Sequence, residues 1–122
     1  MNDKACENDW LMYRYIERMC MCVYLLETLE YFMQGMGVQL NSILCVFSDN
    51  QDVADGDWPE LENFEGVCFY CEYADSPFRA TYQVFFDNLK KAIEERADSY
   101  DVEYRSKIDK YMEEIRLRYK LK

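Results

Sequence analysis

The chain has 122 residues, of which half are hydrophobic and 16% aromatic, and it carries a formal net charge of −10. A charge this acidic argues against a free nucleic-acid binder and against binding at an anionic membrane, because both partners require a basic surface. The length and the apolar content predict one folded domain over residues 1–122 rather than a disordered tail.

The first predicted element is one long helix. Apolar residues recur at three- and four-residue steps between Met12 and Met33, Asn8 or Asp9 is placed to cap the start, and Gly35 and Gly37 mark the end. This pattern predicts a helix over roughly residues 9–34. A helix of that length also leaves room for a break near its middle.

Two strands are predicted in the middle of the chain. The first covers Ser42–Phe47, which is apolar and β-branched, and the second covers the segment GVCFYCEY at residues 66–73. The side chains on both faces of the second strand are largely apolar, so we expect this strand to be covered on both faces. The segment ADSPFRA that follows is predicted to be a turn or an irregular crossing.

Two helices complete the predicted fold. One follows Thr81, which is a plausible N-cap, and the other follows the segment ADSYD and carries its Lys and Arg residues in its last turns. The predicted fold class is therefore α+β, with a long N-terminal helix, a small β-sheet and two C-terminal helices in a single domain.

The charge is concentrated in the middle of the chain. Residues 19–78 contain eleven acids and no Lys or Arg, and seven of the acids lie between Ser48 and Gly66. Gly56 and Pro59 predict an irregular loop there. Like charges this close repel each other, so we expect a cation, a basic partner or a requirement for solubility to account for them. The candidate partner-binding residues are Asp49, Asp52, Asp55, Asp57, Trp58, Glu60, Glu62 and Glu65.

The acidic loop does not have the spacing of a calcium site. An EF-hand loop needs acids at alternate positions, a Gly at the sixth and a Glu at the twelfth, and loops that start at Asp49 or Asp52 both fail. We therefore expect no dedicated metal site and no cofactor.

The six cysteines include two close pairs, and neither pair is predicted to hold zinc. Cys20 and Cys22 lie about 200° apart on a helix of 3.6 residues per turn. Cys68 and Cys71 point to opposite faces of a strand. We expect buried, reduced thiols that act as small apolar side chains, with zinc binding as the less favoured alternative.

Catalytic signatures are missing. The chain has no histidine, which is the commonest general base and the usual partner of a Ser or Cys nucleophile, and it has no phosphate-binding glycine motif. Paired carboxylates would need an apolar pocket to raise one pKa, whereas the acidic loop is expected to be solvated. We predict that the protein is not an enzyme.

A docking surface for a basic partner explains the acidic middle best. Complementary charge steers the encounter of two proteins, and basic surfaces are typical of proteins that handle nucleic acid. Trp58 lies within this charged segment. It is either an aromatic anchor for the partner or a side chain that folds back to fix the loop.

The C-terminal half also resembles a known family. The segments FEGVCFYCEY (64–73), YQVFFDNLKKAIEERADSY (82–100) and KIDKYMEEIRLRYKL (107–121) look like contact-dependent growth inhibition immunity proteins, in particular the ribonuclease-toxin immunity proteins. The first half of the chain has no counterpart in this resemblance. The landmarks are Gly66-Val67, the Phe85–Leu89 helix face, Ile115 and Arg118-Tyr119.

The resemblance implies a non-enzymatic inhibitor that stays in the cytoplasm. Such a protein binds the C-terminal nuclease domain of a toxin delivered by a neighbouring cell and occludes or distorts its active site. The acidic surface would then stand in for the phosphates of the RNA substrate. No residue inherits a role from the family, so the candidate binding residues rest on charge alone.

Three alternatives remain open at this point. The first is an acidic adaptor or antitoxin-like module for another basic nucleic-acid-handling protein. The second is a carboxylate or thiol enzyme, which an exposed cysteine of low pKa would favour. The third is a small structural subunit. The sequence shows no targeting signal or membrane-spanning segment, so a cytoplasmic location is expected.

Overall fold

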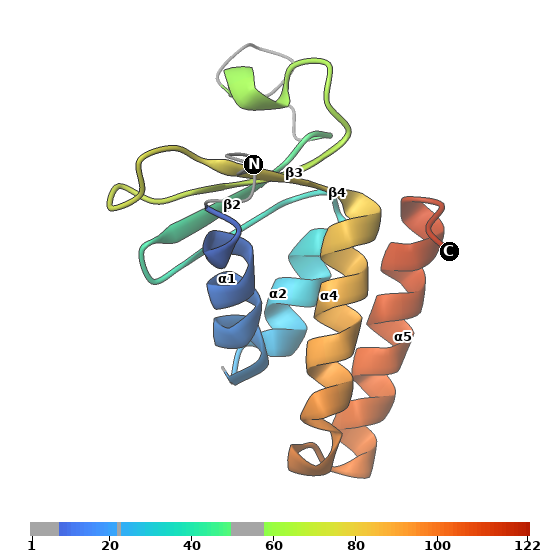
Figure 1. The fold of residues 1–122 in the computed structure, drawn as a ribbon. Helices are drawn as coiled ribbons and strands as arrows, with labels where there is room; N and C mark the ends of the chain where they lie inside the picture. The colour runs from blue at the N-terminus through green and yellow to red at the C-terminus, as the bar shows by residue number, and fades with distance from the viewer. Residues whose placement is uncertain (1–7, 22, 50–57) are drawn as a thin grey trace, which may run out of the picture.

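The fold is an antiparallel sheet with helices packed on one face (Figure 1). The computed structural model describes residues 8–21, 23–49 and 58–122. The sheet has the order β1-β2-β3-β4, so each strand pairs with the next along the chain. The strands are β1 (Gln39–Leu40), β2 (Ile43–Phe47), β3 (Gly66–Tyr70) and β4 (Phe78–Thr81). The helices are α1 (Trp10–Met21), α2 (Leu25–Met33), α4 (Tyr82–Glu95) and α5 (Val102–Arg118), with short 3-10 helices η2 (Pro59–Leu61) and η3 (Ala97–Ser99).

The predicted α+β class is confirmed, and its detailed layout is confirmed only in part. The N-terminal segment forms two helices instead of one, because α1 ends at Met21 and α2 begins at Leu25. The break that the length allowed is therefore present. The break allows the two helices to pack on different partners, because α1 packs against α4 and α2 packs against α5.

Both predicted strands are present as β2 and β3, but β3 ends at Tyr70, and residues 71–73 of the predicted second strand lie in the connection to β4. The two strands pair with Val46 opposite Cys68 and with Cys45 opposite Phe69, and all four residues are buried. The prediction that the second strand is covered on both faces is confirmed. Cover on both sides explains why the strand reads as almost continuously apolar.

The prediction of an irregular crossing at residues 74–80 is wrong at its C-terminal end. Phe78–Thr81 form the edge strand β4, in which Ala80 pairs with Val67. β4 follows Pro77 directly, and Arg79 interrupts its apolar pattern. Four residues with one buried position give too weak an alternation to be recognised from the sequence. The two-residue strand β1 was missed for the same reason.

The C-terminal helices follow the predicted boundaries closely. The Oγ1 of Thr81 accepts a hydrogen bond of 3.1 Å from the backbone N–H of Val84, which confirms the predicted cap of α4. Asp101 caps α5 in the same way, because its Oδ1 accepts from the N–H of Tyr104 at 2.8 Å. No helix in the described ranges is long and apolar enough to cross a membrane.

The main core lies between the sheet and the helices. At its centre the Phe47 ring of β2 packs on Phe32 of α2, with ring centroids 4.8 Å apart, and Phe69 of β3 packs on Phe85 of α4 at 5.5 Å. Aromatic pairs at such distances add to the stabilisation from burial alone. The high aromatic content of the sequence is thus used largely for packing.

A second, smaller apolar cluster lies on the opposite face of the sheet. Val46 and Cys68 point to that face, and Leu61 of η2 covers them and is itself only 1% exposed. Figure 1 shows η2 above the sheet, on the side away from the helices. We call residues 58–65 the cap. The cap belongs to the acidic stretch, so part of that stretch is packed structure.

Candidate functional site

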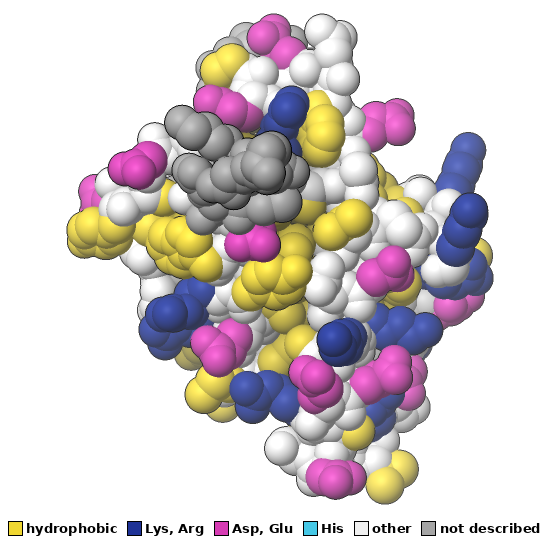
Figure 2. Space-filling view, in the orientation of Figure 1, with side chains coloured by type: hydrophobic (Ala, Val, Ile, Leu, Met, Phe, Trp, Pro, Cys, Tyr) yellow, Lys and Arg dark blue, Asp and Glu magenta, His cyan; other side chains and the backbone are white. Residues whose placement is uncertain are grey.

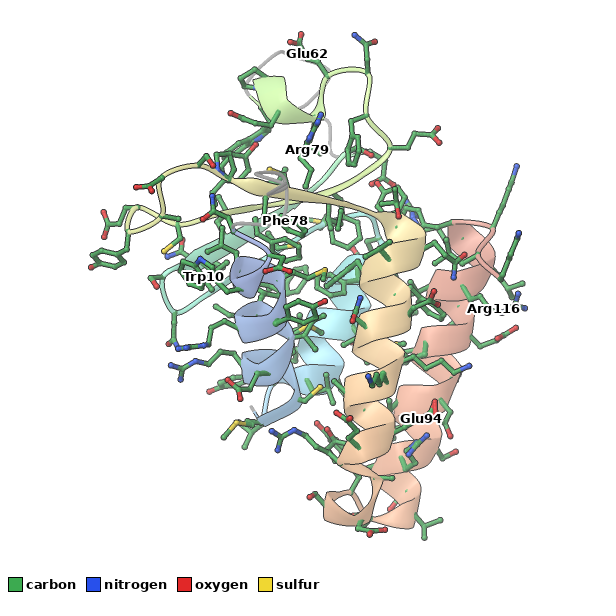
Figure 3. The ribbon with its side chains drawn as sticks, viewed as in Figure 1. Trp10, Glu62, Phe78, Arg79, Glu94 and Arg116 are labelled. Carbon is green, nitrogen blue, oxygen red and sulfur yellow. The ribbon has the colours of Figure 1, made fainter. Side chains whose placement is uncertain are left out.

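The eight predicted partner-binding residues fall into three groups. Asp52, Asp55 and Asp57 lie outside the described residues. Asp49 lies in the turn after β2, away from the cap in sequence. Trp58, Glu60, Glu62 and Glu65 lie in the cap, as Figure 3 illustrates for Glu62.

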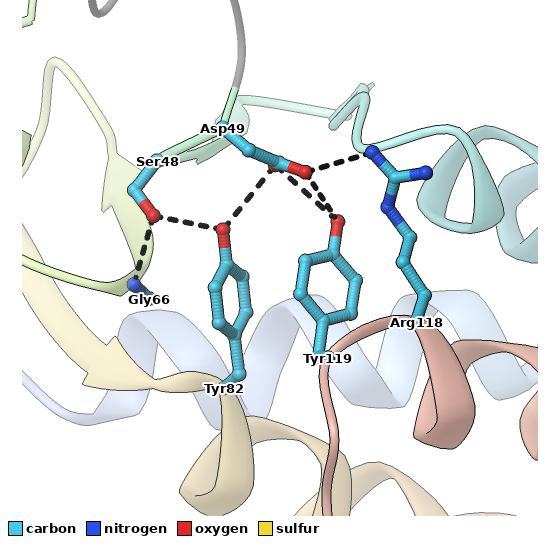
Figure 4. A network of polar contacts seen from close by, with 6 residues as sticks. All are labelled: Ser48, Asp49, Gly66, Tyr82, Arg118 and Tyr119. Carbon is cyan, nitrogen blue, oxygen red and sulfur yellow. Dashed lines mark hydrogen bonds and ion pairs between the residues drawn. The ribbon is translucent and has the colours of Figure 1, made fainter.

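Asp49 is held by residues from the ends of two helices (Figure 4). Its Oδ2 pairs with the Nη2 of Arg118 at 2.9 Å, and it accepts from the hydroxyl groups of Tyr119 at 3.2 Å and Tyr82 at 3.3 Å. The hydroxyl groups of Tyr82 and Ser48 lie 2.8 Å apart, and Ser48 in turn accepts from the N–H of Gly66. We call Asp49, Tyr82, Arg118 and Tyr119 the clasp.

The clasp joins the end of β2 to the start of α4 and the end of α5. The rings of Tyr82 and Tyr119 are stacked, with centroids 4.1 Å apart. Burial raises the pKa of Tyr82 to about 12 and also raises the pKa of Tyr119, so both phenols remain protonated at neutral pH and donate to the carboxylate. Asp49 therefore serves the fold, and its charge is compensated inside the molecule.

Replacement of Asp49 by Asn is expected to destabilise the fold by about 1–2 kcal/mol, because it removes one ion pair at the surface and weakens the bonds from two phenols. Urea denaturation would measure the change. A double-mutant cycle with Arg118→Gln isolates the ion pair, and a coupling energy near zero would contradict its role.

The carboxylate of Glu60 also has a hydrogen-bond partner inside the molecule. Its Oε1 accepts a hydrogen bond of 2.8 Å from the hydroxyl group of Tyr70 on β3. Arg79 of β4 donates to the backbone carbonyl of Glu60 at 3.3 Å, and its guanidinium group lies 4.6 Å from the centre of the Phe64 ring. These contacts fasten the cap to the sheet, and a substitution at Glu60 would disturb them.

Trp58 packs inward. Its ring lies 5.0 Å from the ring of Tyr70, and the residue is half-buried beside the small cluster under the cap. This position matches the interpretation in which Trp58 folds back to fix the loop.

Glu62 and Glu65 are the exposed carboxylates of the cap. Figure 3 shows Glu62 at the top of the cap, pointing away from the sheet. Both residues line a groove of about 960 Å³ between the cap and the C-terminus of α5. Arg118 and Lys120 line the opposite wall.

The groove corrects the sequence-based view of the charge. Residues 19–78 have a single sign of charge along the chain, but Arg79, Arg118 and Lys120 from the C-terminal third come next to them in space. Figure 2 shows the resulting mixture of acidic and basic side chains on one face of the molecule. Because Asp49 and Arg118 lie about 70 residues apart in the sequence, no local pattern could predict that they pair.

Cys68 lies in β3 and Cys71 lies just beyond its end, whereas Cys22 of the other predicted pair lies outside the described residues. Cys68 is buried under the cap, whereas Cys71 packs against the main core and is part-exposed. Burial raises the pKa of the Cys68 thiol to about 11 and that of Cys20 also to about 11. Within the described ranges, no group of three or more His, Cys, Asp or Glu residues is arranged for a metal ion.

The raised thiol pKa values predict a loss of stability at alkaline pH. The folded protein retains the protons of Cys20 and Cys68 up to about pH 11, whereas the unfolded chain loses them from about pH 9. Their contribution to stability is therefore complete below pH 9 and is lost as the pH rises through 11. Urea midpoints at about pH 8 and about pH 10.5 would measure this fall. Cys68→Ala should make the fall shallower, and an unchanged slope would contradict the assignment.

Compared with known protein families, with curated proteins and with solved structures, the chain shows no significant match. The function therefore has to be argued from the site itself.

Proposed function

We propose that this protein is an immunity-type inhibitor that binds a basic nuclease toxin domain of the ribonuclease class through the acidic surface of its cap. The exposed carboxylates Glu62 and Glu65 contact the basic active site of the toxin in place of RNA phosphates. The protein itself catalyses no reaction and acts in the cytoplasm of the cell that makes it.

One observation carries the proposal: the cap is packed on the sheet through Leu61 and still presents charge outward. Leu61 is buried against the sheet, while its neighbour Glu62 and nearby Glu65 are exposed. A surface that is ordered before binding loses less entropy when a partner docks. Exposed acids on such a support are suited to bind a basic surface rapidly and specifically.

The internal contacts of the other acids refine the proposed contact surface. Asp49 is compensated by Arg118, and Glu60 is bonded to Tyr70, so neither is free to turn to a partner without loss of an internal bond. Glu62 and Glu65 are therefore the described residues to which we assign the partner contact. The resemblance of residues 64–121 to ribonuclease-toxin immunity proteins supports the same class of partner.

A binding experiment tests the proposal. The tagged chain is co-expressed with the product of the reading frame directly upstream of its own, and the purified pair is titrated by calorimetry at low and high salt. We expect nanomolar binding that weakens with salt, because screening reduces the attraction between exposed charges. Ribonuclease activity of the partner should be lost in the complex.

Two results would contradict the proposal. One is a partner that has no nuclease activity or keeps that activity in a saturated complex. The other is affinity that does not change between the two salt concentrations, since a charge-based contact requires this dependence.

A further inference from the structure

The outer face of the sheet has a second groove, beside the cap. The cap covers only part of this face, and Leu44 and Tyr70 belong both to the cluster under the cap and to the floor of this groove. The groove has a volume of about 490 Å³. Its walls are the β1–β2 hairpin and the β3–β4 connection, residues 71–77.

The floor of the groove is apolar and fixed. Leu44 and Tyr70 are each part-exposed, and the hydroxyl group of Tyr70 is held by its bond to Glu60. Ala74 and Pro77 add apolar surface on the wall. The neighbouring Tyr73 is 77% exposed. A concave site of this size, with an apolar floor and a few polar groups beside it, is typical of a binding site.

The described residues of the rim carry negative charge alone. Glu72 and Asp75 line the groove and are exposed, and among the residues that the structure describes no Lys or Arg lines it. Within the described residues neither carboxylate forms an ion pair. The groove beside α5 differs in this respect, because Arg118 and Lys120 offset its acids.

An apolar floor with an acidic rim fits a long cationic side chain. Arginine and lysine have an apolar stem that packs on hydrophobic surface and a charged head that reaches carboxylates. An arginine also stacks on an aromatic ring and forms paired hydrogen bonds with a carboxylate. Nucleic acid would be repelled by the rim.

We propose that this groove is a docking site for a basic segment of a protein partner, with one arginine or lysine side chain packed on Leu44 and Tyr70 and bound by Glu72 and Asp75. The proposal goes beyond the inhibitor function, because it concerns the sheet rather than the exposed acids of the cap. It does not require the partner to be a nuclease.

A peptide titration tests the docking site directly. The probe is the capped tetrapeptide Arg-Leu-Arg-Leu, added to the full chain labelled with ¹⁵N, and the counterpart Glu-Leu-Glu-Leu is the negative probe. We expect amide shifts to cluster at Leu44 and at residues 70–76 with the basic peptide. The acidic peptide should leave these amides unchanged.

Two matched double variants distinguish binding in the groove from a general effect of net charge. Glu72→Gln with Asp75→Asn should weaken binding of the basic peptide about fivefold, the loss expected for two exposed charge contacts. Glu94→Gln with Glu95→Gln removes the same charge from an exposed part of α4 and should leave binding unchanged. Both pairs replace exposed side chains, so the fold should be retained.

The part-exposed thiol of Cys71 supplies a second readout, because it lines the same groove. The basic peptide should slow its alkylation, as followed by mass spectrometry of the peptide that contains it. Shifts confined to the cap, equal losses in the two variants, or no shifts at all would overturn the proposal. These outcomes do not depend on whether a nuclease partner is found.

Discussion

Replacement of Phe47 by Ala is expected to lower the free energy of unfolding by about 3–5 kcal/mol, because it leaves a cavity where a large ring was fully buried. Phe47 is 1% exposed and packs on rings from three helical segments. Its centroid lies 4.8 Å from Phe32, 5.7 Å from Tyr82 and 5.9 Å from Tyr119.

The effect should reach beyond the core. Phe47 lies two residues before Asp49 and supports the two tyrosines that donate to that carboxylate. Loss of the ring removes the surface on which Tyr82 and Tyr119 rest, so the clasp should loosen as well. Since small domains are stable by only about 5–15 kcal/mol, this variant should be close to unfolding.

Urea denaturation at neutral pH would measure the loss. Phe47→Leu retains most of the volume and should cost less than about 1.5 kcal/mol. Tyr73→Ala removes an aromatic side chain that is 77% exposed and should change stability by less than about 0.5 kcal/mol. A loss below about 1 kcal/mol for Phe47→Ala would show that the surroundings collapse into the cavity or that the ring is not central.

The sequence predicted the elements whose signals are local. Thr81 and the apolar steps of α4 lie within a few residues of each other, and so do the apolar residues of β2. Helix caps and hydrophobic periodicity act over such distances, which is why these boundaries were accurate. β4 was missed because its pairing with β3, rather than its own pattern, defines it.

The candidate site was harder to predict, because its geometry depends on long-range contacts. The acidic residues of the cap look equivalent in the sequence, yet Glu60 is bonded to Tyr70 and Glu62 is exposed. Asp49 meets Arg118 from the far end of the chain. Charge counting identifies an acidic segment, but only the packing of Leu61 and Tyr70 decides which carboxylates face outward.

Reversal of both Glu62 and Glu65 to Lys is expected to weaken binding of the basic partner by about 100-fold or more, because like charges placed opposite each other cost several kcal/mol. Both side chains are exposed, so the fold should be unaffected. Asp49 and Glu60 are left unchanged, because their internal bonds to Arg118 and Tyr70 would confound a loss of binding with a loss of structure.

The matched control is Glu94→Lys with Glu95→Lys, which changes the net charge equally. Figure 3 shows Glu94 on α4, far from Glu62 at the top of the cap. Calorimetry measures affinity, and urea denaturation verifies that both variants remain folded. If the control loses as much affinity as the cap variant, the partner responds to net charge and not to the cap.

The kinetics of the same complex distinguish steering from direct contact. Salt should slow association of the unmodified protein more than it accelerates dissociation, because exposed charges act mainly on the encounter. The cap variant should associate slowly at every salt concentration and show little further dependence on salt. Affinity retained in that variant would remove the cap from the interface, and the groove beside Glu72 and Asp75 would then be the surface to which the partner's basic side chains are assigned.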